Sequence, residues 1–134
     1  MGKDKGTILV VDDDPDIVAV TSTILKSAGY AVVGANNGAE GLKKARETKP
    51  KLIILDVMMG STTEGFHVAY EIRKDPQLAA TPILMLTAIE KQTGMKFSPD
   101  KDEDYLPVEE FVSKPIDPDD LLARVERLIA GKKA

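Results

Sequence analysis

The amino-acid sequence predicts an α/β fold in which a five-stranded parallel sheet is covered by helices on both faces. Two observations lead to this prediction. Short apolar runs, typical of strands buried on both faces, recur along the chain, and segments with helical apolar spacing lie between most of them. Such an alternation gives parallel strands joined by crossover helices. A length of 134 residues suits one domain of this kind.

The predicted strands share a high content of Ile, Leu and Val. They are Thr7 to Val11, Ala31 to Ala35, Leu52 to Leu55, Ile83 to Leu86, and Phe111 with Val112. After the first of them, Asp14 and Pro15 form a helix start signal, because Asp is a favoured N-cap and Pro is favoured in the first turn. The apolar stripe predicted for this helix is Ile17, Val20, Ile24 and Ala28, ending at Gly29.

Three further helices follow from start signals and apolar spacing. Asn37 and Glu40 resemble a capping box, which predicts a second helix. A third helix is predicted over Gly65 to Lys74, and the run that begins at Asp117 predicts a last one. The inward-facing residues of these helices are Leu42, Ala45, Ala69, Ile72, Leu121, Leu122, Val125, Leu128 and Ile129.

Composition excludes several classes of protein. The net charge of −4 argues against non-specific binding to nucleic acid. The chain has no Cys, so it can form neither a disulfide framework nor a thiolate site. No apolar run is long enough to span a bilayer, and the start lacks a secretion signal, so we expect a cytoplasmic protein. We expect a flexible segment at 1–6, one domain over 7–130 and a short tail at 131–134.

Acidic residues stand at the ends of two predicted strands. Five strands in this length fit the flavodoxin-like order 2-1-3-4-5, in which strands 1 and 3 are neighbours and ligands bind between their carboxyl ends. Strand 1 runs into Asp12 and Asp13, and strand 3 runs into Asp56. These three carboxylates should therefore form one anionic pocket suited to a hard divalent cation. Asp14 is assigned to the helix cap instead.

Two more polar residues fall on the same edge of the sheet. Thr87 directly follows strand 4, and Lys114 follows strand 5. Carboxylates that hold a cation, a hydroxyl and an ammonium suit phosphoryl transfer, because together they neutralise and orient the phosphate oxygens. A carboxylate can act as the nucleophile in such chemistry.

At this point the sequence resembles the receiver domains of two-component response regulators. The matching motifs are Val11-Asp12-Asp13, Leu55-Asp56, Leu86-Thr87-Ala88 and Ser113-Lys114-Pro115. The resemblance covers Thr7 to Ile129. It implies that Asp56 accepts the phosphoryl group, that Asp13 and Asp56 bind Mg²⁺ directly (or Mn²⁺ in its place), and that Asp12 binds it through water. The backbone carbonyl of Met58 would complete the protein ligands.

The resemblance also implies a switch and partners. Thr87 would be the switch hydroxyl, Lys114 the phosphate-pairing lysine and Phe111 the switch aromatic. The phosphoryl group would come from a sensor histidine kinase or a histidine phosphotransfer protein, and output would pass to a downstream protein, without direct nucleic-acid binding or membrane insertion. Such a domain is no enzyme beyond its own Mg²⁺-dependent phosphorylation and dephosphorylation.

The sequence departs from this family in one long segment and leaves two alternatives. Between Thr87 and Lys114 the usual fourth helix has no clear pattern, because Gly94 and Pro99 interrupt it. We expect that helix to be shortened, missing or remodelled. This segment motivates one alternative, a receiver-like binding module that signals without phosphorylation. The other alternative is a phosphatase of the haloacid-dehalogenase type, whose Asp-x-Asp motif Asp12 and Asp14 match only in part.

Overall fold

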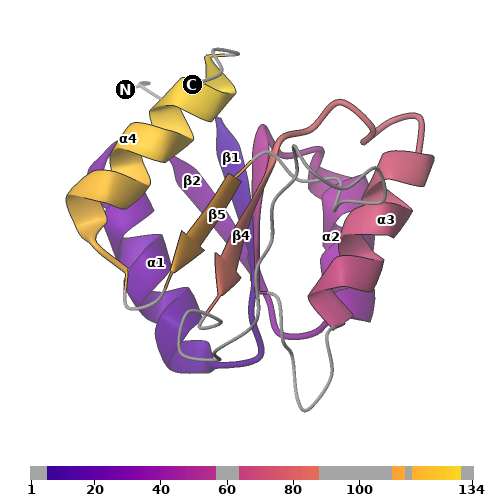
Figure 1. Cartoon of the computed structure of the whole chain (residues 1–134), viewed down its shortest axis with the longest axis horizontal. Helices are drawn as coiled ribbons and strands as arrows, with labels where there is room; N and C mark the ends of the chain where they lie inside the picture. The colour runs from indigo at the N-terminus through magenta and orange to yellow at the C-terminus, as the bar shows by residue number, and fades with distance from the viewer. Residues whose placement is uncertain (1–5, 57–63, 88–109, 114–115, 131–134) are drawn as a thin grey trace, which may run out of the picture.

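The computed structural model describes residues 6–56, 64–87, 110–113 and 116–130. Within these ranges the chain forms five strands and four helices (Figure 1). The strands are β1 (Thr7–Val11), β2 (Ala31–Ala35), β3 (Leu52–Asp56), β4 (Ile83–Thr87) and β5 (Glu110–Ser113). The helices are α1 (Pro15–Ser27), α2 (Gly38–Thr48), α3 (Glu64–Lys74) and α4 (Pro118–Ile129).

The strands form one parallel sheet in the order β2-β1-β3-β4-β5. This is the predicted flavodoxin-like order, and the prediction of the fold is confirmed. Helices α1 and α4 cover one face of the sheet, and α2 and α3 cover the other (Figure 1). The segment in which we expected a changed fourth helix lies outside the described residues.

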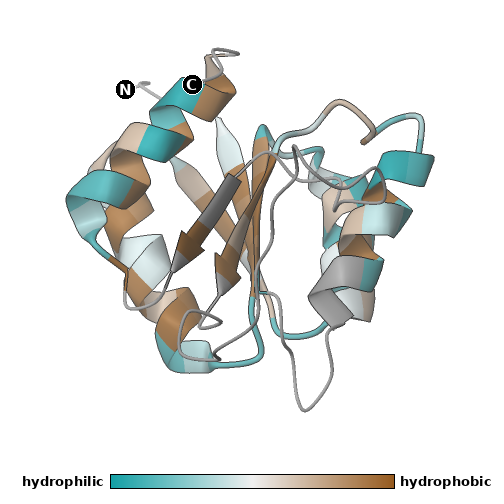
Figure 2. Ribbon diagram, viewed as in Figure 1, coloured by the Kyte–Doolittle hydropathy of each residue, from teal (hydrophilic) through white to brown (hydrophobic). Residues whose placement is uncertain are grey.

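The core has two halves, one on each face of the sheet. Side chains alternate along each strand, so Ile8 and Ile54 pack beneath α1 and α4, whereas Leu9 and Ile53 pack beneath α2 and α3. Apolar colouring accordingly dominates the central strands in Figure 2. Within the part of the chain that the structure describes, no helix combines the length and apolar character needed to cross a bilayer.

Helix α1 begins as predicted, and Ile17, Ile24 and Ala28 of its predicted stripe pack against the core. Asp14 is its N-cap, with Oδ1 accepting a hydrogen bond of 2.9 Å from the Asp16 amide, and Gly29 follows its end with a φ of +101°. The prediction that Val20 faces the core was wrong, because this side chain is 51% exposed. Thr21 is fully buried in its place. Thr21 belongs to the buried stripe because it lies one turn before Leu25, which is also fully buried.

The other helix starts also match the sequence signals. Asn37 caps α2 by accepting a 2.8 Å hydrogen bond from the Glu40 amide, and Asp117 caps α4. The carboxylate of Glu40 reaches back to the amide of Asn36, at 3.0 Å, so the capping box closes one residue earlier than its usual form. Strands β3 and β4 each run one residue beyond the prediction, to Asp56 and Thr87.

An ion pair between Arg46 of α2 and Asp75, the residue that follows α3, makes stability depend on pH. The carboxylate of Asp75 accepts hydrogen bonds of 2.9 Å from the Gln77 amide and 2.9 Å from Arg46 Nε. First the Gln77 amide, then Arg46, hold the pKa of Asp75 below its ordinary value of 3.8. The charged form therefore stabilises the fold above pH 3.8, and this contribution is lost as the pH falls through the lowered pKa.

We expect Asp75→Asn to lower the free energy of unfolding at neutral pH and to make its decline in acid shallower. Urea unfolding at a series of pH values measures both effects. Glu47→Gln is the matched control, because Glu47 is exposed on α2 and lies beside the Arg46 pair without being part of it. If the free energy of unfolding fell equally steeply in acid for Asp75→Asn and the wild-type protein, this account would be contradicted.

Candidate functional site

The acidic residues meet because β1 and β3 are neighbours in register. Val11 lies opposite Leu55, so the residues that follow them, Asp12 and Asp56, reach the carboxyl edge of the sheet together. Asp13 comes next along the chain from β1. One carboxylate oxygen from each of the three residues lies within 4.8 Å of the others. The predicted cluster of Asp12, Asp13 and Asp56 is therefore present.

The three carboxylates differ in their exposure. Asp12 is fully buried, Asp56 is 4% exposed and Asp13 is open to solvent. Burying an ionised carboxylate is costly unless hydrogen bonds or a cation compensate its charge. A cluster that is walled by two buried carboxylates and reached from solvent past a third fits a small hard cation with oxygen ligands. These residues could therefore hold a divalent metal.

Asp12 is fixed from two sides. Its amide donates to the carbonyl of Ala35 at 3.0 Å, which ties it to the end of β2. Its Oδ1 accepts from the amide of Asp14 at 2.9 Å, which ties it to the start of α1. The role of Ala35 was missed from the sequence, since a backbone carbonyl leaves no side-chain signal. The site is thus held by β1, β2 and β3 together.

The backbone of Thr87, another predicted site residue, lies at the same edge of the sheet. Leu86 is paired with Asp56, and Thr87 lies one position beyond it, opposite Ser113 of β5. The backbone of Phe111 pairs with Met85, two positions farther from the edge. Lys114 and Met58 lie outside the described residues, as do the side chains of Thr87 and Phe111. Their roles stay predictions.

Comparison with known proteins assigns this arrangement to a family. Residues 8–126 match the model of the response regulator receiver domain. The chain is 39% identical over 126 residues to the DNA-binding dual master transcriptional regulator RpaA of Synechocystis sp., an alignment that covers 91% of this chain and 48% of that protein. It thus spans about half the length of this relative.

Solved structures show the same relationship. The chemotaxis protein CheY4 of Vibrio cholerae superposes with a TM-score of 0.73 and 34% identity, covering 90% of this chain and 96% of that one. The response regulator TrrA of Thermotoga maritima, solved in complex with Mg²⁺-BeF, superposes with a TM-score of 0.72 and 34% identity, covering 91% and 97%. The chain belongs to the response regulator receiver domain family of two-component signalling.

Proposed function

We propose that this receiver is phosphorylated on Asp56 in a Mg²⁺-dependent transfer from the phosphohistidine of a sensor histidine kinase or a histidine phosphotransfer protein. The observation that carries the proposal is the meeting of Asp12, Asp13 and Asp56 at the crevice between β1 and β3. Open α/β sheets bind their ligands at such a crevice. The complex of TrrA with Mg²⁺-BeF supports the same chemistry in a relative.

In the proposed reaction, an oxygen of Asp56 attacks phosphorus, and the bond from phosphorus to the donor histidine nitrogen breaks. The nitrogen keeps the bonding electrons, and the product is an acyl phosphate on Asp56. Mg²⁺, held by Asp13, Asp56 and the Met58 carbonyl and by Asp12 through water, would neutralise charge on the phosphoryl oxygens. Asp12 would keep its position because Ala35 and Asp14 hold it.

The signal would then pass through the neighbouring strands. Lys114 would pair with one phosphoryl oxygen and the Thr87 hydroxyl would donate to another, leaving room for Phe111 to turn inward. The modification would shift a population between two packings, with output by contact with a downstream protein. We expect no steady turnover of a generic phosphomonoester, because the acyl phosphate on Asp56 would be the signalling state and not a short-lived intermediate.

Beryllofluoride tests the proposal, because it mimics a phosphoryl group on an aspartate. With Mg²⁺ present, we expect it to perturb the backbone amide resonances around Asp56 and Thr87 in an NMR titration. Asp56→Asn, which removes the acceptor oxygen, should abolish the response to beryllofluoride. The absence of perturbation in the wild-type protein at millimolar beryllofluoride would contradict the proposal. Steady release of phosphate from p-nitrophenyl phosphate would favour the phosphatase alternative instead.

A further inference from the structure

Strand β2 is an edge of the sheet, and alternate residues along it turn their backbone groups outward. The Ala31 amide donates to the Gly6 carbonyl at 2.9 Å, and the Ala35 carbonyl accepts from Asp12 at 3.0 Å, so these residues face β1. Because both polar groups of one strand residue point the same way, those of Gly34 and Asn36 point away from the sheet. Outward groups of this kind are templates for another strand.

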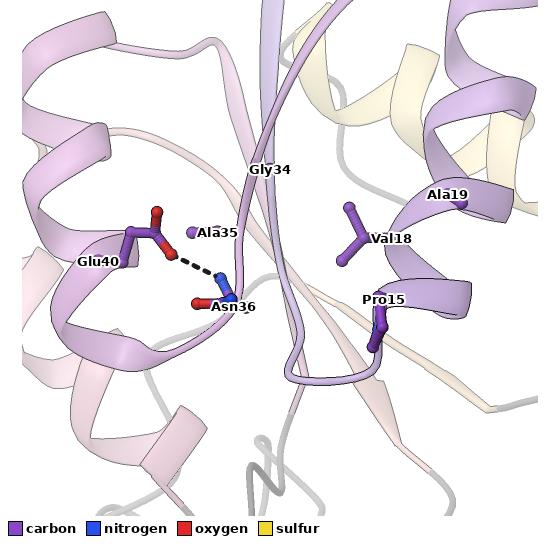
Figure 3. Close-up of a pocket in the computed structure, with 7 residues that line it drawn as sticks. All are labelled: Pro15, Val18, Ala19, Gly34, Ala35, Asn36 and Glu40. Carbon is purple, nitrogen blue, oxygen red and sulfur yellow. Dashed lines mark hydrogen bonds between the residues drawn. The ribbon is translucent and has the colours of Figure 1, made fainter.

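Two side chains of α2 bind these outward groups. Lys44 Nζ donates to the Gly34 carbonyl at 3.0 Å, and Glu40 Oε1 accepts from the Asn36 amide at 3.0 Å, the bond drawn in Figure 3. Lys44 and Glu40 also form an ion pair with each other, at 3.4 Å. We name Glu40 and Lys44 the capping pair. It supplies to the end of β2 the acceptor and the donor that a neighbouring strand would otherwise supply.

A shallow pocket lies beside the same end of β2. Its volume is about 350 Å³, and its lining is mostly apolar (Figure 3). The lining residues are Pro15, Val18, Ala19, Gly34, Ala35, Asn36 and Glu40. A Cβ at Gly34 would lie 2.9 Å from Val18 Cγ1, so the even-numbered residues of β2 turn toward α1 and the pocket. One wall of this pocket is Glu40, a member of the capping pair.

We infer that the β2 edge is a pairing surface for a second copy of this chain and that the capping pair keeps it closed. The edge is self-complementary, because outward residues repeat on either side of Gly34. In an antiparallel pair with Gly34 opposite Gly34, Val32 of one copy lies opposite Asn36 of the other. Opposite residues share a face, so Val32 would meet the apolar pocket beside Asn36. Because the pair is symmetric about Gly34, this apolar contact would form twice, once in the pocket of each copy, whereas an unrelated peptide would fill the pocket once; this favours a second copy.

Lys44→Met tests this inference, because it uncovers the Gly34 carbonyl and keeps a good helix former in α2. We expect self-association, measured by sedimentation equilibrium, to tighten about thirtyfold, because the two Gly34 residues would then exchange two backbone hydrogen bonds, one from each copy. Lys43→Met is the matched control, since it removes the same charge from an exposed position of the same helix. It should leave the association constant unchanged. Unchanged association in Lys44→Met, with circular dichroism showing a folded protein, would overturn the inference.

A second variant distinguishes this edge from other contact surfaces. Ala19→Glu adds a charge to the pocket from an exposed position of α1, where Glu suits a helix. In the Lys44→Met background we expect it to restore the wild-type association constant. Tighter association that Ala19→Glu does not reverse would mean that the copies meet elsewhere, which also overturns the inference. Lys43, Lys44 and Ala19 do not belong to the acidic cluster, so all of these variants should still bind beryllofluoride. A failure of the pairing inference can therefore be told apart from a failure of the proposed phosphorylation.

Discussion

Asp56→Asn is expected to abolish incorporation of phosphate from a small donor such as acetyl phosphate. The substitution keeps the size and shape of the side chain but replaces the attacking carboxylate oxygen by an amide, which is a far weaker nucleophile. It also removes one of the three carboxylates that gather within 4.8 Å. Incorporation, followed by mass spectrometry of the intact protein with Mg²⁺ present, should fall to background.

Asp14→Asn is the matched control for this experiment. Asp14 is an exposed acid two residues from the buried Asp12, yet its carboxylate caps α1. Because Asn is an equally good N-cap, we expect normal incorporation and an unchanged helix. An acyl phosphate that still forms in Asp56→Asn would place the acceptor elsewhere. If Asp56→Asn left all partner binding and cellular output intact, the module that signals without phosphorylation would be the better description.

Of the substitutions proposed here, Ile54→Ala is expected to lower the free energy of unfolding the most. Ile54 is fully buried in β3, the central strand, and it belongs to the half of the core beneath α1 and α4. Removing three carbon atoms there loses transfer free energy and leaves a cavity that paired strands on both sides cannot close. The free energy of unfolding should fall by about 2–5 kcal/mol, measured as a lower urea midpoint.

Val20→Ala is the corresponding surface control, since Val20 is 51% exposed. Its free energy of unfolding should change by less than about 0.5 kcal/mol. A similar loss in both variants would mean that the burial of Ile54 does not determine its contribution. A large loss in Val20→Ala alone would support the prediction from the sequence that Val20 faces the core.

Most of the fold could be predicted because its information is local. A strand buried on both faces needs an unbroken apolar run, and Leu52 to Leu55 is such a run. Asp14 with Pro15 fixes a helix start by backbone chemistry alone. That Asp12 and Asp56 lie close together could be predicted from the strand order, because the carboxyl ends of parallel strands share one edge of the sheet.

Features that depend on tertiary packing could not be predicted. Hydrophobicity alone favoured Val20 over Thr21 for the buried stripe, but the packing of α1 on the sheet buries the threonine. The carbonyl of Ala35 acts through the backbone, so no residue type marks it. The sequence marks Glu40 as a capping residue, yet its bond to Asn36 at the sheet edge depends on where α2 lies against β2.

The hydrogen bond between Asp12 and Ala35 has a thermodynamic consequence. It ties the last residue of the edge strand to the backbone of Asp12, a residue of the acidic cluster, so a displacement of either residue strains the other. Cation binding at the acidic cluster and pairing at β2 would both act on this hydrogen bond, so the two equilibria are linked, and the linkage is reciprocal. If pairing at β2 changes the affinity of the cluster for a cation by some factor, the cation must change the pairing by the same factor. Cation affinity and self-association then report on a single coupling free energy.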